Sequence, residues 1–316
     1  MDFSRRNFMV ASLAALGGCK LGDGGDACGR AYPADFAYGP QKGKLLLKVK
    51  GIRESVRLCV LGDSHLALHD ARDDAYADNY KRMAKGPGDP QKFSETLAQA
   101  KKDKADLVML LGDIISFPAH RNVEFVRSEL DRSGVDWMYV AGNHDWHFEG
   151  VPGTDVEQRR KWLPARLGPL YPPGTNPLGY SRVVKGIRIV AIDDTVYHIL
   201  PEQLAFWESE IAKGDPTILM THIPVWTEGW DYWTCGSPDW GAKVDPCWQI
   251  ERRERWAERQ AAESFAFRDS VLRAPNLIAA FSGHIHTLMM ARGAVNQFSV
   301  PCARKGDHFD VTIVPA

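Results

Sequence analysis

The chain has 316 residues, a formal net charge of -1 and 44% hydrophobic residues. This composition is ordinary for a globular protein, and a charge so close to zero gives no sign of a surface built for nucleic acid or another polyanion. No stretch reaches the roughly 18 apolar residues that a membrane-spanning helix needs. The length suits one large α/β domain, or two small ones, behind an N-terminal segment that folding does not require.

The N-terminus has the features of an export signal. Arg5 and Arg6 precede an apolar run at residues 10–16, and two glycines and Cys19 follow this run. The arginine pair resembles a twin-arginine signal, and the Leu-Gly-Gly-Cys sequence resembles a lipobox, in which a peptidase cuts before a cysteine that carries lipid. These resemblances imply an export signal at residues 1–18, a periplasmic or cell-envelope location, and Cys19 as the lipid anchor. A simple cleaved signal and a chance apolar N-terminus are the alternatives.

Glycine and proline are frequent in residues 19–44, which predicts a flexible tether, and the folded domain is expected at residues 45–316. Short apolar runs of strand length recur along this domain and indicate strands buried on both faces. The predicted strands cover residues 56–61, 107–111, 137–141, 218–220, 277–281, 294–300 and 309–314. Amphipathic helices are predicted at residues 93–102, 122–131, 201–212 and 249–273, and a loop at residues 164–179.

The six cysteines are used in different ways. Cys59 lies in an apolar run and is expected to be a small buried hydrophobe. Cys235 and Cys247 flank a loop rich in glycine, proline and aspartate, and export would place them where disulfides persist. Spacing alone decides neither for nor against a bridge between these two. Cys28 and Cys302 have no assigned partner, and no closely spaced pair indicates a structural zinc site.

Five short polar motifs follow apolar runs and supply ligands for metal ions. They offer carboxylate, amide and imidazole groups, which suit Mn, Fe, Zn and similar ions. Two residues apart in extended backbone, side chains point the same way, so the paired residues of the first and last motifs can address one site. Two metals that share a carboxylate form a device for attacking a phosphate ester. The motifs are Asp63-Ser64-His65, Gly112-Asp113, Gly142-Asn143-His144-Asp145, Thr221-His222 and Gly283-His284-Ile285-His286.

In this order, the five motifs resemble the calcineurin-like metallophosphoesterase superfamily, and the resemblance covers residues 57–286. It implies a four-layer α/β/β/α sandwich, in which two mixed β-sheets are flanked by helices and the dimetal site lies at the carboxyl ends of the strands. The implied ligands of the first metal are Asp63, His65 and His286; those of the second are Asn143, His222 and His284; and Asp113 bridges both.

The resemblance also implies catalytic roles for two residues that are not ligands. His144 is expected to face the substrate, either as a general acid for the leaving alkoxide or as a group that stabilises charge on the phosphate. Asp145 is expected to orient His144 or a neighbour. Many members of the superfamily have Asp three residues after the bridging Asp, and purple acid phosphatases have a Tyr ligand there. Here the residue is Ser116, so tyrosinate-iron colour is not expected and the group that orients His144 is open.

A tryptophan-rich segment at about residues 226–260 begins just after His222 and holds six of the ten tryptophans. Its aromatic rings either stack on a substrate or pack a small subdomain, and a cap would do both. The predicted function is metal-dependent hydrolysis of a small-molecule phosphomonoester or phosphodiester by two divalent or trivalent ions (Mn, Fe or Zn) and a bridging hydroxide. Long nucleic acid is not an expected substrate, and the Cys19 lipid is the only expected membrane contact. The alternative is a non-catalytic, metal-stabilised binding module with the tryptophan-rich segment as its interface.

Overall fold

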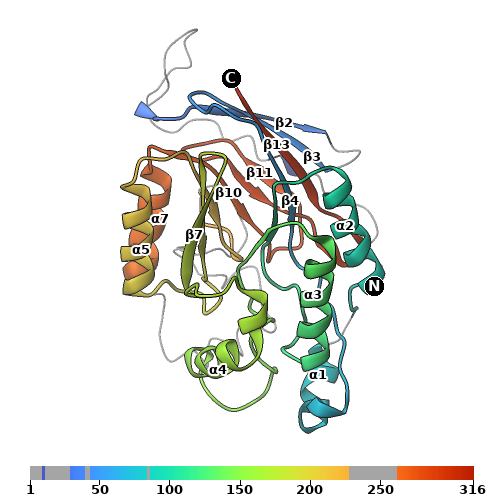
Figure 1. Ribbon diagram of the computed structural model, residues 1–316. Helices are drawn as coiled ribbons and strands as arrows, with labels where there is room; N and C mark the ends of the chain where they lie inside the picture. Colours follow the sequence, from blue (N-terminus) through green and yellow to red (C-terminus); the bar gives the residue numbers. More distant parts are fainter. Residues whose placement is uncertain (1–8, 11–28, 40–42, 84–85, 228–261) are drawn as a thin grey trace.

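Two mixed β-sheets face each other, with helices α2 and α3 outside one sheet and α5 and α7 outside the other (Figure 1). The structure is a computed structural model that describes residues 9–10, 29–39, 43–83, 86–227 and 262–316. This arrangement has four layers and confirms the predicted α/β/β/α sandwich. The tryptophan-rich segment lies almost entirely outside the described residues, and so do Cys19, Cys28 and the Cys235–Cys247 pair.

The seven-stranded sheet has the order β1-β11-β12-β10-β9-β8-β7, in which β8, β9 and β10 run parallel. Its strands are β1 (Met9–Val10), β7 (Gly179–Val184), β8 (Ile187–Ile192), β9 (Thr217–Met220), β10 (Leu277–Ser282), β11 (Met289–Ala291) and β12 (Gln297–Ser299).

The six-stranded sheet has the order β2-β3-β13-β4-β5-β6, in which β4, β5 and β6 run parallel. Its strands are β2 (Ala34–Gly39), β3 (Lys44–Val49), β4 (Val56–Leu61), β5 (Leu107–Leu110), β6 (Trp137–Tyr139) and β13 (Phe309–Pro315). The C-terminal strand β13 joins this sheet between β3 and β4.

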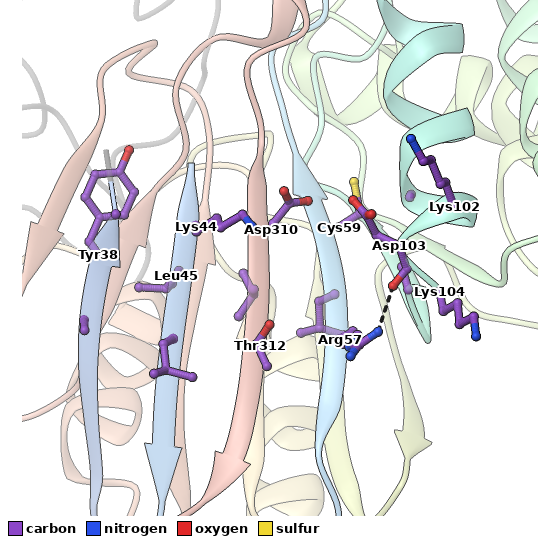
Figure 2. Close-up of a pocket in the computed structure, with 17 residues that line it drawn as sticks. Tyr38, Lys44, Leu45, Arg57, Cys59, Lys102, Asp103, Lys104, Asp310 and Thr312 are labelled. Atoms are coloured by element: carbon purple, nitrogen blue, oxygen red, sulfur yellow. Dashed lines mark hydrogen bonds between the residues drawn. The ribbon is translucent and has the colours of Figure 1, made fainter. Parts of the chain in front are cut away.

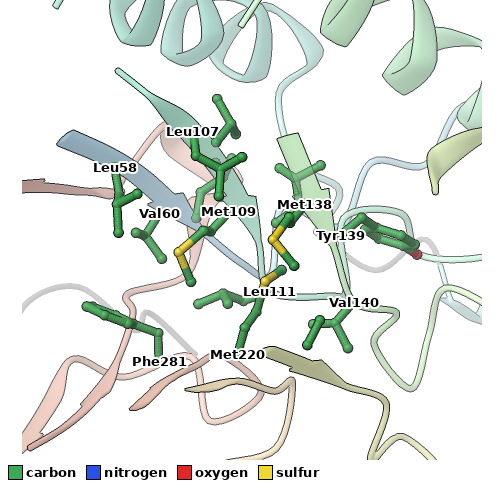
Figure 3. Close-up of a cluster of buried hydrophobic side chains, with 14 of the residues drawn as sticks. Leu58, Val60, Leu107, Met109, Leu111, Met138, Tyr139, Val140, Met220 and Phe281 are labelled. Carbon is green, nitrogen blue, oxygen red and sulfur yellow. The ribbon is translucent and has the colours of Figure 1, made fainter. Parts of the chain in front are cut away.

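Alternate residues of the parallel strands face the two sides of the seven-stranded sheet. Ile189 and Ala191 of β8 belong to the core between the sheets, whereas Val190 and Ile192 pack with Trp207 and other residues beneath α5 and α7. Figure 3 shows how the inner core brings residues of both sheets together, for instance Val60 of β4 and Phe281 of β10. Burial on both faces explains why these strands appear in the sequence as continuous apolar runs.

The helices begin and end at recognisable signals. In α2, Pro90 occupies the first turn, and the Asp89 side chain accepts a hydrogen bond from the Gln91 amide. Gly134 closes α3 in the left-handed conformation. The helices are α1 (Ala77–Met83), α2 (Pro90–Lys102), α3 (His120–Ser133), α4 (Asp155–Trp162), α5 (Pro201–Ile211) and α7 (Ala262–Arg273); short helices are η3 (Ala71–Tyr76), η4 (Leu163–Leu167), η5 (Gly168–Leu170) and η6 (Ala303–Lys305).

Two predicted irregular segments contain regular structure. Part of the predicted tether, residues 19–44, forms strand β2, which pairs antiparallel with β3. Its alternating pattern of half-buried and exposed side chains is that of an edge strand, and the glycines and prolines around it hid this pattern. The predicted loop at residues 164–179 contains most of η4 and all of η5. The hairpin of β7 and β8 was not predicted, although the apolar run of β8 is as clear as that of β4.

A hollow of about 810 Å³ lies on the outer face of the six-stranded sheet, beside the end of α2 (Figure 2). Charged groups line it, among them Lys44, Lys102 and Asp310, and Arg57 donates a hydrogen bond to the carbonyl of Asp103 at 3.1 Å. None of the predicted site residues lines this hollow, so it is separate from the metal centre. Among the described residues, no helix has both the length and the apolar character needed to cross a bilayer.

Candidate metal centre

The seven predicted ligands meet where strands of both sheets end. Asp63 and His65 follow β4, Asp113 follows β5, Asn143 follows β6, His222 follows β9, and His284 and His286 follow β10. Within each sheet these strands are parallel, so their carboxyl ends lie at one edge. Because the two sheets face each other, the carboxyl ends of both strand sets lie next to one another. Active sites in α/β folds usually lie at such strand ends.

The first ligand group consists of Asp63, His65, Asp113 and His286. One donor atom from each of the four lies within 4.8 Å of the other three. The Nε2 atoms of His65 and His286 are 2.9 Å apart, and His286 Nε2 is 3.3 Å from Asp63 Oδ1. Ring nitrogens and carboxylate oxygens that converge on one point are the donors that a metal ion requires.

The second ligand group consists of Asn143, His222 and His284. The Oδ1 atom of Asn143 is 3.1 Å from His222 Nε2 and 3.0 Å from His284 Nδ1. Asp113 joins the two groups, because its Oδ2 atom is 3.5 Å from His222 Nε2 and 3.7 Å from His65 Nε2. The structure therefore brings all seven predicted ligands together in two groups that share one carboxylate.

Five of the seven ligands have left-handed backbone conformations, with φ values between 47° and 69°. This region is costly for residues other than glycine, at about 1–3 kcal/mol each, and such strain clusters at functional sites. Hydrogen bonds hold the strained backbone in place; for example, the amides of Asp63 and His65 donate to the carbonyls of Gly112 and Asp113. The five residues are Asp63, His65, Asp113, His284 and His286.

Charges at the centre favour a bound cation. Burial opposes ionisation of Asp113, but the rings of His222 and His144 outweigh it and hold the pKa of Asp113 well below its usual value. Burial also opposes protonation of His222, yet the Asp113 carboxylate raises the pKa of His222 to about 10. The Asp113 carboxylate thus favours positive charge next to it, and a bound metal ion supplies such charge. Burial lowers the pKa of His65 well below its usual value, which leaves the ring neutral, as a metal ligand must be.

Contacts behind the ligands fix their orientation. His222 Nδ1 lies 2.8 Å from the carbonyl of Leu111, so this nitrogen carries a hydrogen and Nε2 is the ring nitrogen that faces the centre. Asp194, which follows β8 and is fully buried, accepts hydrogen bonds from the amides of His222 and Ile223 through one oxygen, Oδ1. Asp194 was missed in the sequence, although it follows an apolar strand just as the ligands do.

His144 and Asp145 occupy different positions. The His144 ring lies at the rim, 18% exposed, with Nε2 3.9 Å from Asp113 Oδ2. Asp145 is fully buried and accepts hydrogen bonds from the amides of Ile115 and Gly142, one on each oxygen. No hydrogen bond from Asp145 to the His144 ring is observed in the part of the chain that is described. Asp145 thus ties together the two loops that carry Asp113 and Asn143.

Ser116 holds the loop of the first motif. Its hydroxyl donates to the carbonyl of His65 at 3.1 Å, and its amide donates to the carbonyl of Leu66 at 2.8 Å. The side chain therefore supports the strained backbone at His65. Its hydrogen bond goes to this carbonyl and not to the His144 ring.

A family model described as calcineurin-like phosphoesterase matches residues 56–288, which include all seven ligands. The chain belongs to the calcineurin-like phosphoesterase family. It is therefore a phosphoesterase, and the cluster of ligating side chains makes its hydrolysis metal-dependent. No curated protein matches the sequence.

Solved structures share the fold of this phosphoesterase at low sequence identity. A dimetal phosphatase from Danio rerio is 13% identical, with a TM-score of 0.50, over 79% of this chain and 88% of that chain. A purple acid phosphatase, PPD1, from yellow lupin seeds is 14% identical, with a TM-score of 0.49, over 84% of this chain and 47% of that chain. At such identities, the first of these supports the fold alone.

Proposed function

We propose that this phosphoesterase uses two metal ions, held by the two ligand groups and shared through Asp113, to hydrolyse a small-molecule phosphoester. Asp63, His65 and His286 would hold one ion, and Asn143, His222 and His284 the other. The observation that carries the proposal is the position of the Asp113 carboxylate, within 3.7 Å of a ring nitrogen from each group. When bound, the ions supply hydroxide at neutral pH and neutralise charge on the phosphoryl group.

In this proposal His144 donates a proton to the leaving oxygen. Its ring lies at the rim, where it can meet a substrate, and its backbone amide donates to Asp113 Oδ1 at 2.8 Å. This bond fixes the backbone of His144 relative to the shared carboxylate. Asp145 and Asp194 act as positioning residues, because both bind backbone amides of loops that carry ligands.

The test is hydrolysis by the full-length protein, loaded with Mn, Zn or Fe or stripped with a chelator, of nitrophenyl esters and of alkyl esters. We expect metal-dependent turnover. His144→Gln is expected to lower kcat on alkyl esters by about 10²–10⁴-fold. The loss should be much smaller on nitrophenyl esters, because nitrophenolate leaves without a proton.

The matched control is His69→Gln, which changes an exposed histidine that stacks on Tyr80 outside the ligand groups. It is expected to leave turnover and metal content unchanged. Absence of turnover on every ester, with two ions bound per chain, would instead favour the metal-stabilised binding module. Equal losses on alkyl and nitrophenyl esters in His144→Gln would remove the proton-donor role.

A further inference from the structure

Beyond the ligands, the segment that leads from β12 to β13 crosses the metal centre. The amide of Val300 donates to the carbonyl of Ser282, at the end of β10. Three residues later the amide of Ala303 donates to the carbonyl of Gly62, at the end of β4. The Cys302 thiol donates to the carbonyl of the ligand Asp63 at 3.1 Å. The segment thus links both sheets at the first ligand group and delivers Arg304 beside it.

The backbone of Arg304 is fixed by the loop at residues 86–89. The carbonyl of Arg304 accepts a hydrogen bond from the Asp89 amide at 3.0 Å, and the Gly88 amide donates to the carbonyl of His65 at 3.0 Å. A Cβ atom on Gly88 would lie 1.8 Å from the Ser64 carbonyl oxygen and 3.4 Å from Arg304 Cα, so the loop is wedged tightly between them. Arg304 is therefore held at a set place next to His65.

The guanidinium of Arg304 has no carboxylate partner in the part of the chain that is described. Its Nε atom is buried and makes no hydrogen bond there, and no ion pair to Arg304 is found among the described residues. The loop that binds its backbone carbonyl also donates, through the Gly88 amide, to the carbonyl of the ligand His65, so Arg304 lies close to the first ligand group. A fixed cation beside metal ligands, with no carboxylate partner among the described residues, is suited to bind an anion.

The chemistry of a phosphoryl group indicates which anion. A phosphodiester has two non-bridging oxygens, which a pair of metal ions can satisfy. A phosphomonoester has a third, and carries more negative charge, so it gains from a further fixed donor. Guanidinium presents paired N–H donors that match phosphoryl oxygens, and such charge-assisted bonds are the strong ones.

We propose that Arg304 binds a phosphoryl oxygen at the first ligand group and thereby makes the site favour phosphomonoesters over phosphodiesters. This inference rests on the proposed function. The family match ends at residue 288, so it covers the ligands but not Arg304. Substrate preference would then depend on a residue outside the matched region.

The test compares Arg304→Gln with the wild type in two measurements on metal-loaded, full-length protein. Calorimetry measures binding of inorganic phosphate, and kinetics measures kcat/KM on nitrophenyl phosphate and on bis-nitrophenyl phosphate. We expect Arg304→Gln to weaken phosphate binding, and to lower kcat/KM on the monoester, by about 10- to 100-fold. The kcat/KM on the diester should change by less than about threefold. Arg304→Lys should bind phosphate with an affinity between those of the wild type and Arg304→Gln, because lysine keeps the charge but lacks the paired N–H donors of guanidinium.

Lys305→Gln is the matched control, since it removes a charge from the next, exposed residue of η6 and should change phosphate binding less than about threefold. Metal content is measured for every variant. Unchanged phosphate binding in Arg304→Gln would overturn the inference, and so would equal losses on monoester and diester. Wild-type protein that hydrolyses neither ester, yet binds phosphate through Arg304, would uphold the anion-binding role while the proposed hydrolysis fails.

Discussion

At the scale of single residues, the centre depends on backbone that is costly to form. The left-handed ligands, Asp63 and His65 among them, persist because neighbouring strands and buried side chains hold them. Two buried carboxylates fix neighbouring parts of the ligand loops by accepting hydrogen bonds from backbone amides. Asp145 uses both of its oxygens for amide donors, whereas Asp194 uses one oxygen for two donors.

This difference predicts that the same substitution costs more stability at Asp145 than at Asp194. Asp145→Asn places an NH₂ group against a backbone N–H, so it is expected to lower the free energy of unfolding by about 1–3 kcal/mol and to weaken metal binding. Asp194→Asn keeps an oxygen where both amides donate, so its loss should be less than about 1 kcal/mol. Urea unfolding of the metal-free variants measures the loss of stability, and their metal content after dialysis measures the loss of metal binding.

Asp194→Ala is the control for this pair, because it removes the acceptor and should weaken metal binding by about 10- to 100-fold. If Asp145→Asn and Asp194→Asn proved equally stable, the two carboxylates would not act through the hydrogen bonds described.

At the same scale, the sequence predicted the ligands and an orienting role for Asp145, but not the roles of Asp194 and Ser116. The ligands have chemically distinctive side chains in short motifs. Asp194 follows an apolar strand as the ligands do, but it belongs to no recognisable motif. Asp194 and Ser116 both bind backbone groups of other segments, and the sequence does not show which groups they bind. The role of Arg304 depends on a crossing between two sheets, which only the fold shows.

At the scale of elements, glycines allow the ligand loops to approach one another. A Cβ atom on Gly283 would lie 2.6 Å from Asp63 Oδ2, whereas one on Gly293 would meet nothing within 4 Å. Gly283→Ala is therefore expected to displace Asp63, lower the metal content and cost about 1–3 kcal/mol of stability.

Gly293→Ala is the matched control and should change the stability by less than about 0.5 kcal/mol. Metal analysis and thermal unfolding measure both variants. Full metal content in Gly283→Ala would show that the loops are not packed as closely as described.

The start of β13 predicts a pH dependence of stability. Burial opposes protonation of His308, but Asp310, 3.4 Å away, and the carbonyl of Gly306 raise its pKa above the usual value. A raised pKa stabilises the fold fully below the unfolded value of about 6.5, and this contribution is lost as pH rises through the folded value. The stability gap between wild type and His308→Gln should therefore shrink between about pH 6 and 8.5.

Urea unfolding of both proteins at each of the two pH values measures this gap. The pH dependence of metal binding is common to both proteins and cancels in the difference. In an Asp310→Asn background the gap should depend less on pH, because the main partner of His308 is removed. A gap that grows with pH would contradict the assignment.

Most of the elements were predictable where burial gives the sequence a clear apolar pattern. The continuous apolar runs of β4, β5, β9 and β10 gave their strands, and the segments predicted as helices at residues 93–102, 122–131 and 201–212 correspond to α2, α3 and α5. Edge strand β2 was not predicted, because half-buried residues among glycines and prolines carry a weak pattern. The short helices η4 and η5 were also missed, since proline and glycine within them resemble a loop.

At the scale of the whole molecule, the carboxyl ends of two sets of parallel strands, one in each sheet, lie side by side. This geometry makes one centre from motifs more than 200 residues apart. His65 and His286, for example, are separated by 221 positions, yet their Nε2 atoms lie 2.9 Å apart. Order of motifs along the chain was enough to predict this meeting. The fold explains it, because each motif leaves a buried strand at the same edge of its sheet.

The most direct measurement is anomalous diffraction from crystals of the protein loaded with zinc or manganese. We predict two peaks: one among Asp63, His65 and His286, and a second among Asn143, His222 and His284, with Asp113 contacting both. A single peak at either group, or peaks that do not touch Asp113, would contradict the shared two-metal centre on which the proposed hydrolysis depends.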